Sequence, residues 1–245
     1  MANEEVKISI SIKDLYKSYG KKQVLKGINL EVIEGELIGF IGRNGVGKST
    51  TIDCMIGAKK FDKGTILVDG FDIRKNPLEA KYSYGYVASE PTCYEEMTGL
   101  DYLEFIASIY GLSEGEFKNN YKYLCNRLQL NLEELNNQIA DYSHGMKQKL
   151  AIISAWIHEP KLIMMDEPFV GLDPKASHLL KEMMRETCNR GNAIFFSTHV
   201  LEVAEKLCDK VAIIKQGRLV KSGTMEDVKG DDSLEEVFLE LEAES

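Results

Sequence analysis

The alternation of apolar and polar residues predicts two kinds of strand in the first part of the chain. Residues 6–12 and 28–32 alternate between apolar and polar side chains, as strands do when one face meets solvent. Residues 37–41 read Leu-Ile-Gly-Phe-Ile without alternation, which is typical of a strand covered on both faces. We therefore expect the chain to pass from a peripheral sheet into a central sheet after Gly35.

Apolar residues at helical spacing dominate residues 91–158, and strand-like runs return after them. Two apolar runs, at 162–165 and 193–197, flank a helical stretch at 174–188, which is the order of a βαβ unit. The predicted fold class is therefore α/β, with a parallel core sheet and a helical insertion. Helices are expected in the insertion at 102–110, 117–128 and 146–157. The acidic end of the chain predicts a short helix with an apolar face formed by Leu234, Val237, Phe238 and Leu241.

Composition and charge narrow the possible functions. With 245 residues, of which 44% are hydrophobic, the chain can bury a sizeable core. Its net charge of -9 disfavours direct binding to nucleic acid. No apolar run approaches the roughly 18 residues that cross a bilayer, and the N-terminal residues lack the pattern of a signal peptide, so we expect a cytoplasmic protein. Five cysteines without CxxC spacing predict reduced thiols.

A glycine-rich segment lies between a predicted strand and a predicted helix. Residues 42–49, Gly-Arg-Asn-Gly-Val-Gly-Lys-Ser, match the phosphate-binding pattern GxxxxGK(S/T) in the context that the pattern requires. Glycines let backbone N–H groups close around phosphate oxygens, and the helix N-terminus adds partial positive charge. Lys48 supplies a charge for the β and γ phosphates, and Ser49 supplies a hydroxyl for Mg²⁺. The expected nucleotide-binding residues of this segment are Gly42, Asn44, Gly45, Gly47, Lys48, Ser49 and Thr50.

Two acidic residues end the apolar run at 162–165. Successive side chains of a strand diverge, so Asp166 is expected to hold Mg²⁺, directly or through water, while Glu167 polarises the water that attacks the γ-phosphate. The alternative interpretation of this pair is a solvated strand end. His199 follows the run at 193–197 and is a candidate for orienting the same water, although an isolated histidine there is more often a helix-capping or core residue.

Together with Tyr142-Ser143-His144-Gly145-Met146 before a predicted helix, these motifs resemble those of ABC transporter ATP-binding subunits. The family signature is usually LSGGQ, of which this chain keeps Ser143 and Gly145. The resemblance implies a P-loop NTPase fold of the ABC type, with a mixed central sheet, an antiparallel β subdomain and a helical subdomain. It also implies a single ABC domain over residues 1–245, whose parts are 1–90, 91–158, 159–224 and the short acidic helix at 225–245.

The same resemblance assigns roles to several residues. It places Tyr19 against the adenine of ATP, with Tyr16 as the local rival, and it identifies His199 as the switch histidine. Ser143 and Gly145 are implied to contact the γ-phosphate held by another subunit, through backbone donors at a helix N-terminus. Two copies, or this chain and a homologous ATPase subunit, would then enclose two Mg-ATP. Hydrolysis would separate them.

Two positions depart from the family pattern. Ser89 stands where the family usually has a glutamine, or sometimes a glutamate, that contacts Mg²⁺ and the attacking water. Serine is too short to contact both directly, so we expect a water between Ser89 and the metal, or Glu90 in its place, with slower turnover. His144 replaces the first glycine of the signature and either points to solvent or, when protonated, adds positive charge near the phosphates.

The resemblance implies an ATPase that drives transport through separate membrane-spanning permease subunits, at the inner face of the cell membrane. The segments SHGMKQKL and SLEEVFLEL resemble those of small exporter-type subunits, and the coupling surface is expected near residues 91–110. One alternative is a non-transport ABC ATPase acting on ribosomes or DNA, which the single cassette and the acidic composition disfavour. Another is a regulatory ATP-binding protein with weak hydrolysis, which Ser89 keeps open.

Overall fold

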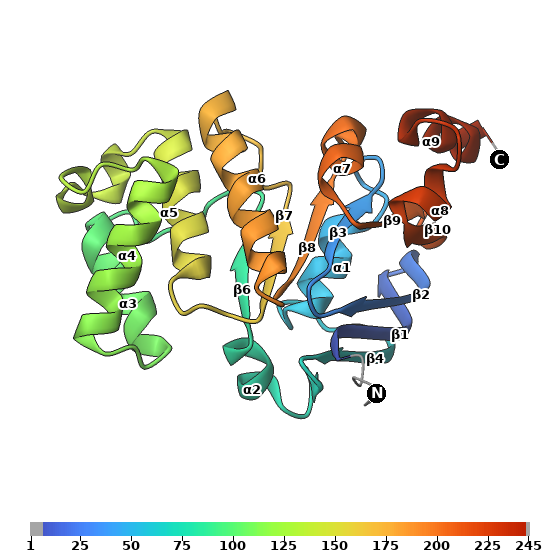
Figure 1. Ribbon diagram of the computed structural model, residues 1–245. Coiled ribbons are helices and arrows are strands. Elements are labelled where there is room, and N and C mark those ends of the chain that lie inside the picture. The colour runs from blue at the N-terminus through green and yellow to red at the C-terminus, as the bar shows by residue number, and fades with distance from the viewer. Residues whose placement is uncertain (1–6, 244–245) are drawn as a thin grey trace, which may run out of the picture.

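The computed structural model describes residues 7–243, and its strands form two sheets (Figure 1). The strands are β1 (Ile8–Tyr19), β2 (Lys22–Ile33), β3 (Leu37–Ile41), β4 (Lys63–Val68), β5 (Phe71–Asp72), β6 (Tyr84–Val87), β7 (Leu162–Asp166), β8 (Ala193–Thr198), β9 (Lys210–Lys215) and β10 (Arg218–Thr224). An antiparallel sheet has the order β2-β1-β4-β5. The central sheet has the order β10-β9-β3-β8-β7-β6 and is parallel except for the β9–β10 pair. The predicted α/β fold class is therefore confirmed.

The central sheet separates two hydrophobic cores. All five residues of β3 are buried, and their side chains alternate between the cores. Leu37 and Ile41 pack in a core shared with the helices that follow β6. Ile38 and Phe40 pack in a core shared with the antiparallel sheet and with α1 (Lys48–Met55). This cover on both faces explains why residues 37–41 show no alternation.

The antiparallel sheet is more enclosed than the alternation of residues 6–12 indicated. Ile10 and Ile12 face the second core, as expected. Ser9 and Ser11, on the face expected to meet solvent, are also buried. Because β1 lies between β2 and β4, neighbouring side chains cover this face, and the Ser11 hydroxyl donates to Glu31 Oε1 at 3.3 Å. Small hydroxyl residues are therefore compatible with a covered face when a partner lies within reach.

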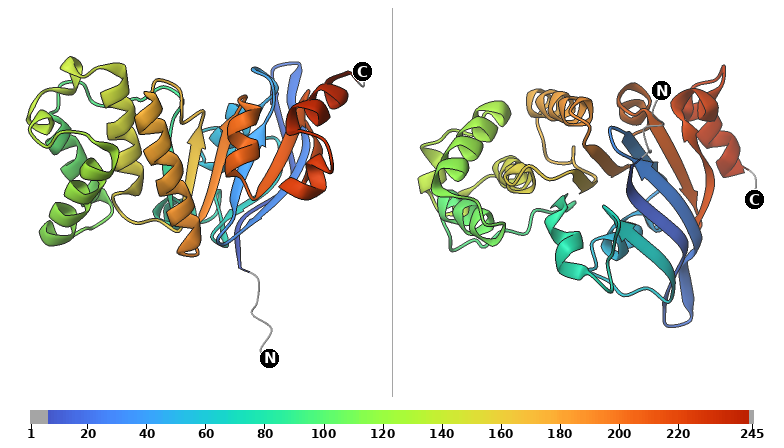
Figure 2. Two further views of the ribbon diagram at one scale, coloured as in Figure 1. Left: turned by 45° about the horizontal axis from the view of Figure 1, so that its top comes forward. Right: turned by 60° about the horizontal axis from the view of Figure 1, so that its bottom comes forward.

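The helical part of the chain stands at the side of the central sheet away from the antiparallel sheet, as the two views of Figure 2 show. It contains α3 (Gly99–Ile109), α4 (Glu114–Leu128) and α5 (His144–Trp156), with short 3₁₀ turns η1 (Glu134–Asn136) and η2 (Ile139–Asp141). Hydroxyl side chains cap the N-termini of all three helices: Thr98, Ser113 and Ser143. These caps explain why α3 and α4 begin before the apolar spacing does.

The remaining helices cover the edges and the first core. They are α2 (Pro77–Tyr82), α6 (Pro174–Asn189), α7 (Leu201–Leu207), α8 (Met225–Lys229) and α9 (Leu234–Ala243). In α9, Leu234, Val237 and Phe238 are buried and Leu241 packs beside them, which confirms the apolar face predicted for this segment. None of the helices within residues 7–243 combines the length and apolar character needed to cross a membrane.

Candidate active site

The glycine-rich segment forms the loop between β3 and α1. Gly45 and Gly47 have φ angles of +81° and +120°, in the region that favours glycine. A Cβ atom on Gly47 would lie 2.8 Å from Leu25 Cδ2, and one on Gly42 would lie 2.6 Å from the carbonyl oxygen of Ile214. Backbone conformation therefore favours glycine at 45 and 47, and packing beneath the loop favours it at 42 and 47.

A hollow of about 220 Å³ lies over this loop. It brings together most of the residues that the sequence selected, because the loop, the end of β6 and the end of β7 meet at the carboxyl edge of the central sheet. Its lining residues are Asn44, Gly45, Gly47, Lys48, Ser49, Thr50, Ser89, Asp166 and Glu167.

The ammonium group of Lys48 lies between the loop and an acid. Its side chain is only 5% exposed. Nζ donates to the carbonyl oxygen of Gly42 at 2.6 Å and to that of Arg43 at 3.4 Å. The same atom lies 3.2 Å from Glu167 Oε1. The loop and the nearby carboxylate thus hold a buried cation at the hollow, where an anionic ligand would meet it.

Glu167 has an unusual backbone conformation for a residue with a side chain. Its φ is +48°, and such a conformation costs of the order of 1 kcal/mol and persists where surrounding contacts impose it. Oε2 lies 3.0 Å from His199 Nδ1, which brings the predicted histidine to the site through this carboxylate. Oε1 is buried and accepts no hydrogen bond from the described part of the chain. Its charged partner within the chain is the Lys48 ammonium, at 3.2 Å.

The structure adds Ser197, a residue that the sequence did not single out as functional. Ser197 lies at the end of β8, opposite Asp166 of β7, and is fully buried. Its hydroxyl donates to Asp166 Oδ1 and accepts from the Glu167 N–H at 3.1 Å. The parallel register between two segments about thirty residues apart creates this contact, and no local motif signals it.

The signature residues do not line this hollow. Ser143 caps α5, and its hydroxyl accepts from the Met146 N–H at 3.3 Å. His144 is exposed, with one edge of its ring against Gly171, where a Cβ atom would lie 2.2 Å from His144 Cδ2. The predicted contact of Ser143 and Gly145 with a nucleotide is therefore not made to the hollow of the same chain.

The two candidate tyrosines differ in their surroundings. The ring of Tyr19 is 44% exposed, and the Lys17 ammonium lies 4.7 Å from its centroid. Tyr16 is half-buried, and its hydroxyl occupies the space where a Cβ on Gly27 would stand, at 2.7 Å. Of the two rings, that of Tyr19 is the more accessible to a stacking partner.

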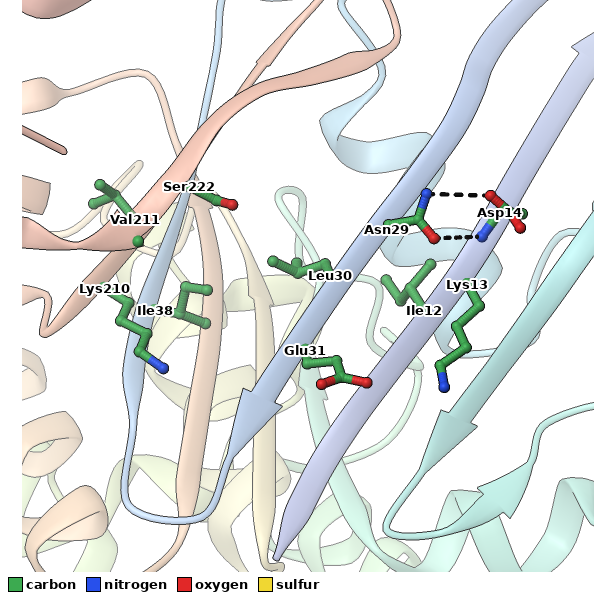
Figure 3. Close-up of a pocket in the computed structure, with 11 residues that line it drawn as sticks. Ile12, Lys13, Asp14, Asn29, Leu30, Glu31, Ile38, Lys210, Val211 and Ser222 are labelled. Carbon is green, nitrogen blue, oxygen red and sulfur yellow. Dashed lines mark hydrogen bonds between the residues drawn. The ribbon is translucent and has the colours of Figure 1, made fainter. Parts of the chain in front are cut away.

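A second hollow, of about 480 Å³, lies between the antiparallel sheet and β9–β10 (Figure 3). Its polar groups are largely paired with protein. Asn29 Oδ1 accepts from the Asp14 N–H at 3.0 Å, and Asn29 Nδ2 donates to Asp14 Oδ1 at 3.2 Å. The Lys210 ammonium pairs with Glu36. This hollow shares no lining residue with the one over the glycine-rich loop, and nothing in its chemistry indicates a ligand.

Comparisons with known proteins agree with this geometry. A family profile described as ABC transporter matches residues 25–170. The chain is 35% identical over 240 residues to the ABC-type transporter ATP-binding protein EcsA of Bacillus subtilis (strain 168), covering 96% of this chain and 97% of that protein. It is 34% identical to the Nod factor export ATP-binding protein I of Rhizobium sp. (strain N33), covering 89% of this chain and 71% of that protein. A solved structure of an ATP-binding subunit of an ABC transporter superposes with a TM-score of 0.91 at 37% identity, covering 95% of this chain and 99% of the other.

Proposed function

The chain belongs to the ATP-binding proteins of ABC transporters, which are ATPases, and from this premise we propose that it hydrolyses Mg-ATP between two cassettes to power export through separate membrane subunits. The observation that carries the proposal is the hollow that gathers Lys48, Asp166 and Glu167 while leaving the signature outside. The gathering of Lys48, Asp166 and Glu167 at one hollow supports hydrolysis. The position of the signature outside that hollow supports a pair of chains.

The residues over the glycine-rich loop suit a triphosphate. Backbone N–H groups of a loop with left-handed glycines, the start of α1 and the Lys48 ammonium are all donors or positive charges for phosphate oxygens. Ser49 and Asp166 line the same hollow, and hydroxyl and carboxylate oxygens are the ligands that Mg²⁺ prefers. Bound Mg²⁺ would neutralise charge that develops on the phosphates. Tyr19 is the residue that we assign to the adenine.

Glu167 is the general base in this proposal. Its buried Oε1 lies 3.2 Å from the Lys48 ammonium, and its Oε2 lies 3.0 Å from His199 Nδ1. A carboxylate fixed in this way orients a water molecule and accepts its proton as the water attacks the γ-phosphate. Because Ser89 lines the hollow with a short side chain, it would reach a metal there only through water, and we expect slower turnover than with a glutamine at this position.

A second chain completes the site. Ser143 and Gly145 stand at the start of α5, whose first N–H groups have no partners within the helix and favour an anion. Since these residues lie outside the hollow of their own chain, the γ-phosphate would meet them across an interface between two cassettes. ATP then holds the pair together, and its hydrolysis releases the pair.

An exposed apolar surface supports the proposal that the chain contacts a membrane partner. α2, α3 and the segment between β6 and α3 present five large side chains that are each at least 42% exposed: Leu78, Tyr82, Tyr94, Phe105 and Ile109. We call this surface the α2–α3 patch. Tyr82 donates to the Ile109 carbonyl at 3.2 Å, and the ring of Tyr94 lies 6.0 Å from that of Phe105, so contacts join its parts. Such patches mark interaction sites, and we assign this one to a cytoplasmic segment of the permease.

Replacement of the general base tests the proposal. Glu167→Gln is expected to lower ATP turnover by about 100-fold or more, because the amide accepts no proton at neutral pH. ATP binding is expected to persist, and ATP-dependent dimers are expected to accumulate in light scattering. Glu133→Gln, an exposed residue of the helical part, is the matched control and should behave as the original chain. Normal turnover by Glu167→Gln would remove Glu167 from this role.

A further inference from the structure

The hydroxyl of Ser197 joins the two acids of the site. It donates to Asp166 Oδ1, and it accepts from the backbone N–H of Glu167 at 3.1 Å. The carbonyl oxygen of Ser197 accepts from the same N–H at 3.2 Å. A serine hydroxyl has one donor and can also accept. Here the hydroxyl donates to Asp166, which is assigned to the metal, and accepts from Glu167, which is assigned as the general base.

We propose that Ser197 is a positioning residue for ATP hydrolysis, which orients the Asp166 carboxylate toward Mg²⁺ and holds Glu167 in its left-handed backbone conformation. The inference rests on the proposed function, because it takes the roles of Asp166 and Glu167 from it. Ser197 itself does not line the hollow and is fully buried, so it acts through these two residues.

The contact with Asp166 limits how that side chain can turn. Asp166 is 3% exposed, and its Oδ1 is held by the serine. A carboxylate with one oxygen held by a buried donor cannot rotate freely, so its second oxygen is left to meet the cation. Without the hydroxyl, the buried Oδ1 would lose a charge-assisted hydrogen bond, which is stronger than a neutral one. The carboxylate would then turn to find another donor, and its affinity for the metal would fall.

The contact of Ser197 with the Glu167 N–H holds the backbone of Glu167 in its left-handed conformation. A φ of +48° is unfavourable for glutamate unless surrounding contacts impose it. The N–H of Glu167 has two acceptors on Ser197, one from the side chain and one from the main chain. Removal of the hydroxyl leaves only the hydrogen bond from the Glu167 N–H to the Ser197 carbonyl, which continues the pairing of β7 with β8. The Glu167 carboxylate would then be less firmly placed relative to His199 and Lys48.

A purely structural serine would behave differently. Ser83 is such a residue: it is also buried, and its hydroxyl donates to the Ala80 carbonyl at 2.7 Å, but it lies outside the hollow. Ser83→Ala is therefore the matched control for loss of a buried hydroxyl. Ser197→Thr keeps the hydroxyl and is the conservative variant. Ser197→Cys keeps a weaker donor and avoids the additional methyl group in a fully packed position.

The test measures metal binding and turnover separately. Mn²⁺ binding to the ATP-loaded chain is followed by electron paramagnetic resonance, and kcat and KM for ATP are measured with Mg²⁺. For Ser197→Ala we expect Mn²⁺ affinity to fall about 10-fold, as for loss of one hydrogen bond to a charged group. We expect kcat to fall by about 10-fold or more while KM for ATP stays within about 2-fold, because the phosphate loop is unchanged. Ser197→Thr should recover both values, and Ser83→Ala should change neither.

Each result decides a different question. Ser197→Ala with the original Mn²⁺ affinity and kcat, and with only a lowered Tm like that of Ser83→Ala, would overturn the positioning role. Should Ser197→Ala fail to fold, Ser197→Cys carries the test: because its thiol is a weaker donor and acceptor, we expect Mn²⁺ affinity and kcat below those of the original chain, and values equal to the original would overturn the role. If the original chain bound Mn²⁺ with ATP but did not hydrolyse ATP, the proposed function would fail, whereas the Mn²⁺ comparison would still report on Ser197.

Discussion

His158 is expected to make the free energy of unfolding depend on pH. It follows α5, and its ring stacks on that of Tyr110 with centroids 3.5 Å apart and planes 8° apart. Nε2 lies 3.2 Å from the Tyr84 carbonyl oxygen, and Nδ1 is buried without a hydrogen-bond partner in residues 7–243. Burial lowers the pKa of His158 to about 4, against a smaller opposing effect of the Tyr84 carbonyl. The folded chain therefore holds this histidine neutral at neutral pH.

The sign and size of the effect follow from the two pKa values. In the unfolded chain the pKa is about 6.5, so between pH 6.5 and 4 the unfolded chain binds a proton that the folded chain does not. Unfolding is therefore favoured as the pH falls. The stability due to the neutral histidine is fully present above pH 6.5 and is lost as the pH falls to the folded pKa. At about 1.4 kcal/mol per pKa unit, the total is about 3 kcal/mol, a large part of the stability of an ordinary domain.

Urea unfolding of the original chain and of His158→Phe at pH 7.5 and pH 5 measures this effect. Phenylalanine keeps an aromatic ring against Tyr110 but does not titrate. Other ionisable groups contribute equally to both proteins, so the difference in unfolding free energy between them isolates His158. We expect that difference to change by about 2 kcal/mol between the two pH values, in favour of the variant at pH 5. His178→Gln, at an exposed histidine on α6, should show little change.

A difference between the original chain and His158→Phe that stayed the same at both pH values would refute this reasoning. It would mean that the histidine is already solvated, or already protonated, in the folded chain. The position of His158 is important because its ring connects β6, the strand that leads to Ser89, with the end of α3.

Two further outcomes are expected. Ser89→Gln should raise ATP turnover by roughly 2-fold to 10-fold, because the longer amide reaches a metal in the hollow that Ser89 lines, and an unchanged or lower rate would count against a missing metal contact. Phe105→Ser, in the α2–α3 patch, should leave the turnover of the isolated chain unchanged but reduce its recovery with the membranes of cells that produce it, whereas unchanged recovery would contradict the assignment of the patch.

Patterns among neighbouring residues were sufficient to predict much of the fold and of the candidate site. The covered strand at 37–41, the loop with Lys48 and the acids after residue 165 can each be predicted from a few neighbouring residues. The structure places the loop and the acids at one hollow. The same holds for α9, whose buried face follows from helical periodicity alone. These features are short-range, because side-chain period, glycine conformations and helix caps depend on neighbours in the sequence.

The tertiary structure decided how distant segments meet. The parallel register of β7 and β8 sets Ser197 opposite Asp166, and no motif near either residue indicates this pairing. Strands β4 and β9 were not predicted, since each pairs with a segment elsewhere in the chain. Strand β10 was not predicted either, although it pairs with β9 directly before it. The left-handed turn at Glu167 likewise depends on acceptors from β8. A sequence specifies which groups can bind phosphate, but the contacts that orient them are made across the sheet, where register and packing are properties of the whole fold.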